Sequence, residues 1–187
     1  MDYHETVLRA SASSLSSLRY FKPQYMSLSK PHPLWTTCSN NSYECSKAIL
    51  QAKMISGRYK TDRLARHFGQ NNDGNCRICN ENADGSIEHL LLHCPSLATT
   101  RQKMFHLLHE RDDYCATTRH LINSIMGGPS ESDKVQLLLD CSCLPDIISS
   151  QLSDNRTMLE IFRFTRTWCF AVHSMRLKIE KDQERIA

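Results

Sequence analysis

The sequence predicts an all-α fold, and three observations carry this prediction. Apolar residues recur at helical spacing in several segments of the chain. No segment shows the strict alternation of apolar and polar residues that is typical of a half-buried strand. Asn, Asp, Gly and Pro separate the periodic segments, and these residues commonly begin or end helices. We therefore expect an irregular helical domain without internal repeats.

The first segment, residues 1–42, is expected to hold an N-terminal helix and a proline-containing extended stretch. The helix is expected over residues 5–20, where apolar side chains lie among many serines. Three prolines then predict an extended, non-repetitive backbone, because proline restricts both its own backbone and that of the preceding residue. Tyr25 and Trp35 in this stretch are expected to pack on a neighbouring element.

Three helices are expected next. A polar run, residues 40–42, precedes a strongly periodic helix that Gly57 ends. Thr61 is the predicted N-cap of a second, short helix, since a threonine hydroxyl can accept a hydrogen bond from a backbone N–H of the first turn. Ser96 is the predicted N-cap of a third helix, which runs to about Glu110.

The last segment, residues 113–187, is also expected to be helical. It begins with a helix closed by a Gly-Gly-Pro run, followed by helices over 130–141 and 145–152. The final helix is expected over about 157–185. Its apolar face predicts that Trp168 lies in the core rather than on the surface. That face carries Ile161, Phe164, Trp168, Ala171, Met175 and Ile179.

The most specific feature of the sequence is one run of cysteine and histidine. Two cysteines stand in a C-x2-C pair, a histidine follows after nine residues, and a third cysteine follows after four more. This is ligand spacing for one tetrahedral zinc site. Asp and Gly residues before and within the run supply turns, so the run can close as a small CCHC knuckle. The predicted ligands of one structural Zn²⁺ are Cys76, Cys79, His89 and Cys94.

Two alternatives accompany this prediction. A C-x-x-C pair can instead be a redox motif, although such a motif is expected between a strand and a helix. The fourth ligand could be His93, which shares a helical face with His89. We prefer Cys94, because Pro95 should end the helix there and because thiolate is the softer ligand. Three thiolates leave the site negative, and backbone N–H groups or Arg77 are expected to offset that charge.

Composition predicts an intracellular protein, nuclear or cytoplasmic. The chain has 187 residues and nine cysteines, and its N-terminus shows no apolar signal-peptide core. No apolar run approaches a membrane span, so no membrane partner is expected. The cysteines are then expected to be thiols and metal ligands rather than disulfides. The expected organisation has three segments: residues 1–42, basic helices with the zinc module over 43–112, and a helical segment over 113–187.

Positive charge is concentrated just before the zinc run. Residues 47–67 contain six Lys and Arg side chains against one Asp, whereas the whole chain has a formal net charge of only +3. Clustered cations next to a zinc knuckle fit contact with the phosphate backbone of RNA or DNA. A solvated helix face is the simpler alternative. The predicted contact residues are Lys53, Arg58, Lys60, Arg63 and Arg66.

Enzymatic activity is not expected. The sequence from His89 to His93 lacks the glutamate that an H-E-x-x-H metalloprotease uses as general base. A closed shell of four protein ligands also leaves no position for an activated water. The chain has neither a P-loop nor a G-x-S-x-G motif. A metallohydrolase is therefore strongly disfavoured.

The run Cys-Arg-Ile-Cys, continued by Ile-Glu-His-Leu-Leu-Leu-His-Cys-Pro-Ser-Leu and then Arg101, resembles the zinc-binding tail of non-LTR retrotransposon (LINE-type) reverse transcriptases. Residues 48–59 and 164–173 are similar to flanking parts of such tails. The resemblance implies the same four zinc ligands, a reverse transcriptase core as partner, and a role in holding template RNA or target DNA during target-primed reverse transcription. The polymerase and endonuclease parts of that family are absent from this chain.

Two functions follow as expectations from these observations. The first is a non-catalytic, zinc-stabilised module that binds nucleic acid. The second is a zinc-stapled structural or protein-interaction domain that does not itself bind nucleic acid. Binding of the zinc-loaded protein to RNA and DNA at several salt concentrations distinguishes the two, since contacts to phosphates weaken steeply with salt.

Overall fold

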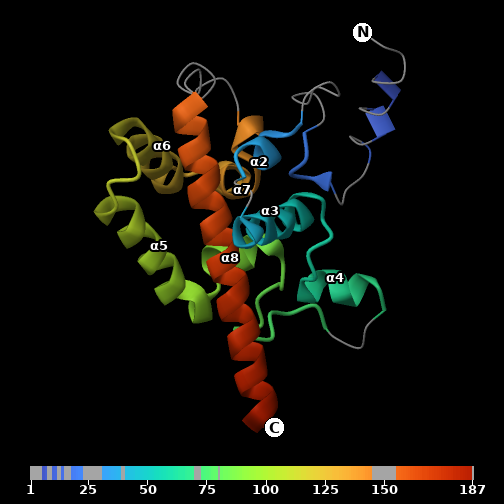
Figure 1. The fold of residues 1–187 in the computed structure, drawn as a ribbon. Coiled ribbons are helices and arrows are strands. Elements are labelled where there is room, and N and C mark those ends of the chain that lie inside the picture. Colours follow the sequence, from blue (N-terminus) through green and yellow to red (C-terminus); the bar gives the residue numbers. More distant parts are fainter. Residues whose placement is uncertain are drawn as a thin grey trace. The chain divides into compact units, whose positions relative to one another are not determined.

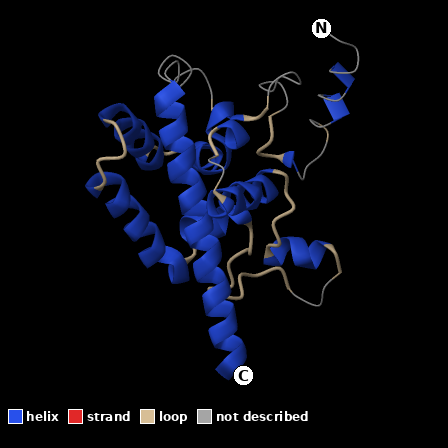
Figure 2. Ribbon diagram, viewed as in Figure 1, coloured by secondary structure: helices blue, strands red, loops and turns tan. Residues whose placement is uncertain are grey.

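The computed structural model describes residues 6–7, 10–11, 14, 18–22, 31–38, 41–69, 73–79, 81–144 and 155–186. Within these ranges the chain consists of helices joined by loops and turns, and no strand is formed (Figures 1 and 2). The expected all-α class is therefore confirmed.

The helices are α2 (Pro33–Thr36), α3 (Ser42–Ile55), α4 (Asp62–His67), α5 (Ala98–Glu110), α6 (Ala116–Gly127), α7 (Glu131–Asp140) and α8 (Asn155–Ile186). The chain also forms a π-helical turn (His89–His93) and two 3-10 turns, Pro95–Leu97 and Cys141–Cys143. The helix α8, red in Figure 1, runs without a break to the C-terminal end of the chain.

Side-chain caps fix where two of the predicted helices begin. The Asn41 side chain accepts a hydrogen bond from the N–H of Tyr43 (2.8 Å) and so starts α3. The Thr61 hydroxyl accepts from the N–H of Leu64 (3.1 Å), which confirms Thr61 as the N-cap of α4. Just beyond α3, Gly57 adopts a left-handed backbone (φ 65°), which fits its predicted role in ending the helix.

The prediction that Ser96 caps the next helix is wrong. Ser96 lies inside the 3-10 turn that Pro95 opens, and α5 begins only at Ala98. The Ser96 hydroxyl donates instead to the carbonyl of Ile78 (2.5 Å). Proline at the first position of the turn fixes its backbone near helical φ, so the chain turns before Ser96 can act as a cap.

The prediction of an extended stretch before residue 42 is also wrong in part. Pro33 opens the short helix α2, where its missing N–H costs nothing, and the ring Nδ1 of His32 accepts from the N–H of Leu34 (3.1 Å). Trp35 was expected to pack on a neighbouring element, and its side chain is 46% exposed. Tyr25, the expected helix over 145–152 and most of the one over 5–20 lie outside the described residues.

The chain divides into two compact units. The first comprises Met1–Tyr59 and Asp113–Arg166. In it α7 packs against both α3 and α6. The buried amide of Gln51, on α3, donates to the carbonyls of Leu138 and Leu139 on α7 (2.9 Å each). The amide nitrogen of Gln51 is thus satisfied, whereas its Oε1 is buried without a hydrogen-bond partner among the described residues.

The second unit comprises Lys60–Asp112 and Thr167–Ala187. It contains α4, the Cys/His run, α5 and the C-terminal part of α8. Trp168 is fully buried in this unit, with its ring edge-to-face to Phe105 (5.1 Å between centroids). The predicted core position of Trp168 is therefore confirmed.

These units cut across the segments expected from the sequence. The expected segment 43–112 is divided between Tyr59 and Lys60, and the expected segment 113–187 is divided within α8, between Arg166 and Thr167. In the described part of the chain, no helix has both the length and the apolar character that a membrane span requires.

Candidate metal centre

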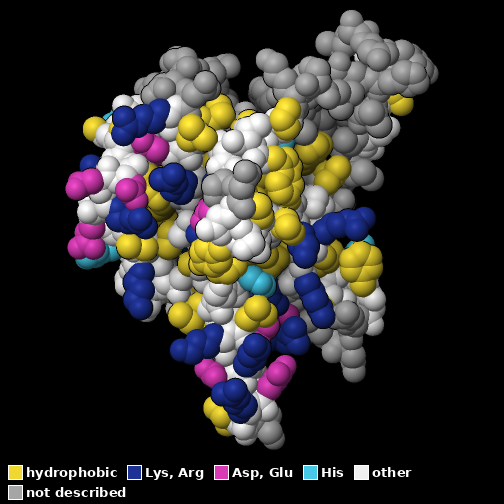
Figure 3. All heavy atoms as spheres, in the orientation of Figure 1, with side chains coloured by type: hydrophobic (Ala, Val, Ile, Leu, Met, Phe, Trp, Pro, Cys, Tyr) yellow, Lys and Arg dark blue, Asp and Glu magenta, His cyan; other side chains and the backbone are white. Residues whose placement is uncertain are grey.

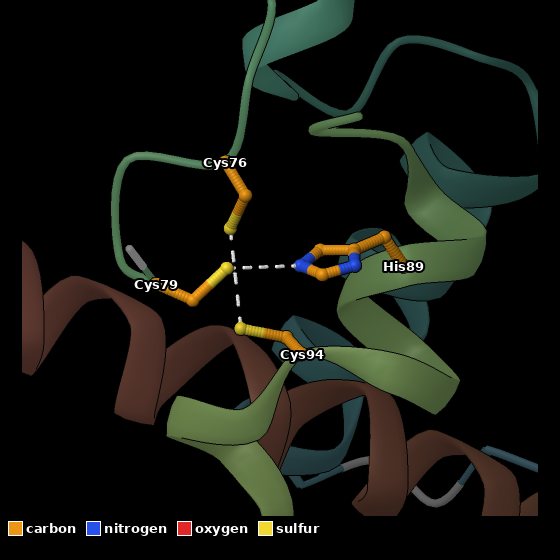
Figure 4. A group of neighbouring side chains, drawn as sticks. All are labelled: Cys76, Cys79, His89 and Cys94. Carbon is orange, nitrogen blue, oxygen red and sulfur yellow. Dashed lines mark hydrogen bonds between the residues drawn. The ribbon is translucent and has the colours of Figure 1, made fainter. Parts of the chain in front are cut away.

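The structure brings together all four side chains that the Cys/His run singles out. Cys76 and Cys79 come from the loop after α4, His89 opens the π-helical turn, and Cys94 follows that turn. Their side chains point toward one another (Figure 4). The ligand atoms all lie within 4.8 Å of one another.

The cluster has the size of a tetrahedral metal shell. The Sγ atoms of Cys76 and Cys94 are 3.9 Å apart, and the Sγ of Cys79 is 3.3 Å from Nε2 of His89. Metal–sulfur bonds of about 2.3 Å in a tetrahedron place two sulfurs about 3.8 Å apart. None of the four residues is more than 8% exposed. The four side chains are thus close enough, and sufficiently shielded from solvent, to hold one metal ion.

A short hairpin presents the C-x2-C pair. The N–H of Cys76 donates to the carbonyl of Ala83 (2.8 Å), and the N–H of Gly85 donates to the carbonyl of Gly74 (2.8 Å). Gly74 has a φ of 84°, a backbone conformation that glycine adopts without steric cost. The predicted turn residues therefore close the knuckle where the sequence indicated.

The π-helical turn explains how Cys94 reaches the cluster. A straight α-helix would leave Cys94, five residues after His89, away from the histidine face. Here the N–H of Cys94 donates to the carbonyl of His89 (2.7 Å), a hydrogen bond between residues five apart. The wider π-helical turn therefore brings Cys94 to the same side as His89. His93, the alternative ligand, is exposed and does not belong to the cluster.

The thiols of the cluster change one another's pKa values. A hydrogen bond from the Cys94 thiol and smaller contributions from the backbone N–H groups of Ile78 and Cys79 outweigh burial, and together they lower the pKa of Cys76 to about 5. The same Cys76 interaction, together with burial, raises the pKa of Cys94. Burial raises the pKa of Cys79. One thiolate therefore forms readily, and the other two thiols keep their protons until a cation displaces them.

Groups around the cluster hold its loops in place. Arg101, on α5, donates to the carbonyl of Cys94 (2.8 Å), as Ser96 does to that of Ile78. Arg77 was an expected counter-charge for the thiolates. Its guanidinium instead pairs with Asp62 (Nε–Oδ1 2.7 Å), so the backbone N–H groups toward Cys76 are the stabilising donors.

An ion pair between α4 and α8 supports the knuckle, and the sequence did not reveal it. Arg176 is buried, with Nη2 3.5 Å from Oδ1 of Asp62 and Nη1 donating to the carbonyl of Lys60 (2.7 Å). Its Nε also pairs with Glu180 (2.8 Å). Nothing in the sequence distinguishes Arg176 from the other cations of the last helix. The only hint was that Asp62 is the single carboxylate in residues 47–67.

The five predicted nucleic-acid contacts are all exposed. Lys53 and Arg58 belong to the first unit, and Lys60, Arg63 and Arg66 to the second. Arg63 pairs with Asp84 (2.9 Å), and Arg66 donates to the carbonyl of Asp73 (3.0 Å). The sixth cation of the run, Lys47, is buried and pairs with Glu44 (2.8 Å).

No family model matches the chain, and neither a curated protein nor a solved structure matches it significantly. What the four clustered side chains do must therefore follow from their own geometry and chemistry.

Proposed function

We propose that Cys76, Cys79, His89 and Cys94 hold one structural Zn²⁺. Three sulfurs and one imidazole nitrogen form a donor set that suits zinc, and their spacing fits a tetrahedral shell. Four protein ligands fill that shell, so no position remains for a reacting water. The metal would stabilise the fold and would not catalyse a reaction.

The proposed zinc would join the knuckle to α4 and α5. Bound metal would fix the loop carrying Cys76 and Cys79 against the turn that ends at Cys94. The carbonyls of Ile78 and Cys94 accept hydrogen bonds from Ser96 and Arg101, so the same ion would also anchor the start of α5. Metal binding and local folding should then be one process.

Zinc content tests this first part of the proposal. Protein expressed with zinc should contain about one equivalent by elemental analysis. Cys76→Ser should lose the metal and unfold the knuckle, whereas Cys115→Ser, a cysteine outside the cluster, should keep it. Folded wild-type protein without zinc would overturn the assignment.

We further propose that the zinc module binds RNA or DNA through phosphate contacts, with little sequence preference. The observation that carries this proposal is the link between the knuckle and the basic helix. Asp62, the first residue of α4, pairs with Arg77 of the knuckle, and exposed Arg63 and Arg66 follow on the same helix. A metal-fixed helix would hold these cations in a defined place, as recognition of a charged backbone needs.

The proposed context is the one implied by the sequence resemblance. There the chain corresponds to the zinc-binding tail of a non-LTR reverse transcriptase, and the reverse transcriptase core would be its protein partner. The tail would then hold template RNA or target DNA while the core carries out polymerisation.

A second candidate function is a structural or protein-interaction domain. It is favoured by the engagement of Arg63 with Asp84 and of Arg66 with the carbonyl of Asp73, because a phosphate would have to compete with both contacts. The C-terminal end of α8 carries Lys and Arg side chains interspersed with Asp and Glu (Figure 3), a pattern of a solvated surface rather than a nucleic-acid groove.

Salt-dependent binding of the zinc-loaded protein to single-stranded RNA and to duplex DNA separates the two functions. Replacing Arg58 and Arg63 by Ala should lower the slope of log K against log salt by about one unit per cation. The matched control replaces Lys103 and Lys181, two exposed cations outside residues 47–67, and removes the same charge. Nucleic-acid binding is rejected if the wild type binds neither ligand at low salt. If both double variants weaken binding equally, residues 47–67 are not the specific contact surface.

A further inference from the structure

A second pair of neighbouring sulfurs lies in the first unit and shares no residue with the metal centre. The Sγ atoms of Cys38 and Cys45 are 3.8 Å apart, and both residues are half-buried. Cys38 follows α2, and Cys45 lies in the first turn of α3. Among the described residues, no group of three or more possible metal ligands includes this pair.

One buried guanidinium contacts the residue that precedes each cysteine of the pair. Arg166 donates to the carbonyl of Thr37 (2.9 Å) and to its hydroxyl (2.8 Å), and Thr37 immediately precedes Cys38. The same guanidinium lies 3.8 Å from the carboxylate of Glu44, which immediately precedes Cys45. The two thiols are therefore positioned by the fold.

The other cysteines outside the cluster have different roles. Cys141, Cys143 and Cys169 are almost fully buried, and burial raises the pKa of each thiol. Cys115 is half-buried like Cys38, but its sulfur accepts from the N–H of Thr118 (3.4 Å) and caps α6. Cys38 and Cys45 thus combine partial exposure with a neighbouring thiol.

We propose that Cys38 and Cys45 form a reversible disulfide that links the end of α2 to the start of α3. A disulfide requires sulfurs about 2.0 Å apart, so the pair must approach by somewhat less than 2 Å, which side-chain rotation can supply. The oxidant is a low-molecular-weight disulfide such as glutathione disulfide. One thiolate attacks it and expels a glutathione thiolate, and the second protein thiolate then expels the other. Two protein thiols are oxidised, and one glutathione disulfide is reduced to two glutathione thiols.

The sequence around the pair gives a direct assay. Trypsin should release residues 20–47 as one peptide, because both internal lysines precede proline. This peptide contains Cys38 and Cys45 and no other cysteine. The zinc-loaded full chain is equilibrated with mixtures of reduced and oxidised glutathione and quenched in acid. Free thiols are then alkylated, the protein is digested, and the peptide masses are measured by mass spectrometry. The expected product has lost two hydrogens and carries no alkyl group.

Three controls accompany the assay. Cys115, half-buried without a neighbouring thiol described for it, should form at most a mixed disulfide with glutathione. In Cys45→Ser, Cys38 should also stop at the mixed disulfide, because the resolving thiol is gone. Denatured wild type should need about tenfold more oxidising conditions to close the ring, since its thiols are not positioned. The proposal is overturned if peptide 20–47 stays doubly alkylated, or carries only glutathione adducts, under conditions that modify Cys115.

Discussion

Asp62 and Arg176 form an ion pair that is almost completely removed from solvent, with side chains 1% and 5% exposed and 3.5 Å between Oδ1 and Nη2. The pair joins the first residue of α4 to α8. Arg77 of the knuckle bonds to the same carboxylate oxygen (2.7 Å). One buried carboxylate therefore connects three parts of the second unit, and removing its charge leaves the Arg176 guanidinium without its partner in α4.

Asp62→Asn should lower the free energy of unfolding by roughly 3 kcal/mol, because buried Arg176 loses its charged partner in α4, although it keeps Glu180. Asp84→Asn is the matched control. Asp84 also pairs with an arginine, Arg63, but both side chains are more than half exposed, and such pairs contribute about 1 kcal/mol or less. Denaturant unfolding of both zinc-loaded variants measures the difference. If both variants lost the same free energy of unfolding, the buried ion pair would contribute no more to stability than the exposed one.

Gly85→Ala should destabilise the knuckle. A β-carbon at Gly85 would lie 2.6 Å from Cβ of Asp62 and 3.0 Å from the carbonyl oxygen of Gly74, and neither atom can move freely. We expect a loss of about 1–3 kcal/mol in unfolding free energy and weaker zinc binding in competition with a chelator.

The same substitution at Gly127 is the control. Gly127 is the last residue of α6, and an added β-carbon there meets nothing within 4 Å. Alanine is the better helix former, so Gly127→Ala should be neutral or stabilising by up to about 1 kcal/mol. Similar losses for both variants would argue against the close contact at Gly85.

Cys94→Ser should abolish zinc binding, whereas His93→Ala should leave it intact. Cys94 is buried in the cluster, and His93 is exposed beside it. Elemental analysis of the two variants, purified in the same way, measures the zinc content. The opposite result would identify His93 as the fourth ligand and would require the π-helical turn to rearrange when the metal binds.

Trp168→Ala should cost about 3–5 kcal/mol of stability, because the buried indole packs edge-to-face on Phe105. Trp35→Ala removes the other tryptophan of the chain, which is 46% exposed, and should cost clearly less. Thermal unfolding followed by circular dichroism compares them. If Trp168→Ala weakened nucleic-acid binding without lowering the melting temperature, Trp168 would be a base-stacking residue instead.

Local sequence signals predicted the local parts of this structure. The spacing of the four ligands was sufficient to predict the cluster. A tight turn brings Cys76 and Cys79 together, and one helical turn brings His89 and Cys94 together. Thr61 and Gly57 predicted their helix boundaries for the same reason. Ser96 was misassigned because cap preference alone does not include the effect of Pro95 on the turn.

Charged residues that are buried by tertiary contacts could not be predicted in this way. Nothing in the sequence distinguishes Arg176 and Arg166 from the other cations of the last helix, or Lys47 from the other cations of residues 47–67, yet all three are buried. In the fold, Arg176 pairs with Asp62 and Arg166 donates to the carbonyl of Leu34, both distant in sequence. Lys47 pairs with Glu44 on the neighbouring turn of α3. Helical periodicity shows which face a residue occupies and does not reveal a partner from another helix.

The stability of the first unit should depend on pH through Glu160. This carboxylate accepts from the N–H of Cys115 (2.7 Å), the hydroxyl of Thr118 (2.7 Å) and the guanidinium of Arg156 (2.8 Å). Burial alone would raise its pKa, but these three donors outweigh burial and lower the pKa of Glu160 to about 2 from an ordinary 4.5.

A lowered pKa stabilises the fold at every pH above the unfolded value, and this stabilisation disappears as the pH falls from about 5 toward 2. Glu160→Gln cannot ionise, so it should unfold more easily than wild type at pH 7, by up to about 3 kcal/mol. The gap should narrow steadily between pH 5 and pH 2. Urea unfolding of both proteins across this range measures it, and loss of metal in acid affects both alike. The control is Glu184→Gln, which removes an exposed carboxylate near the end of α8; its unfolding free energy should follow that of wild type at every pH. If the difference in unfolding free energy between wild type and Glu160→Gln did not change with pH, the charge of Glu160 would contribute nothing to stability.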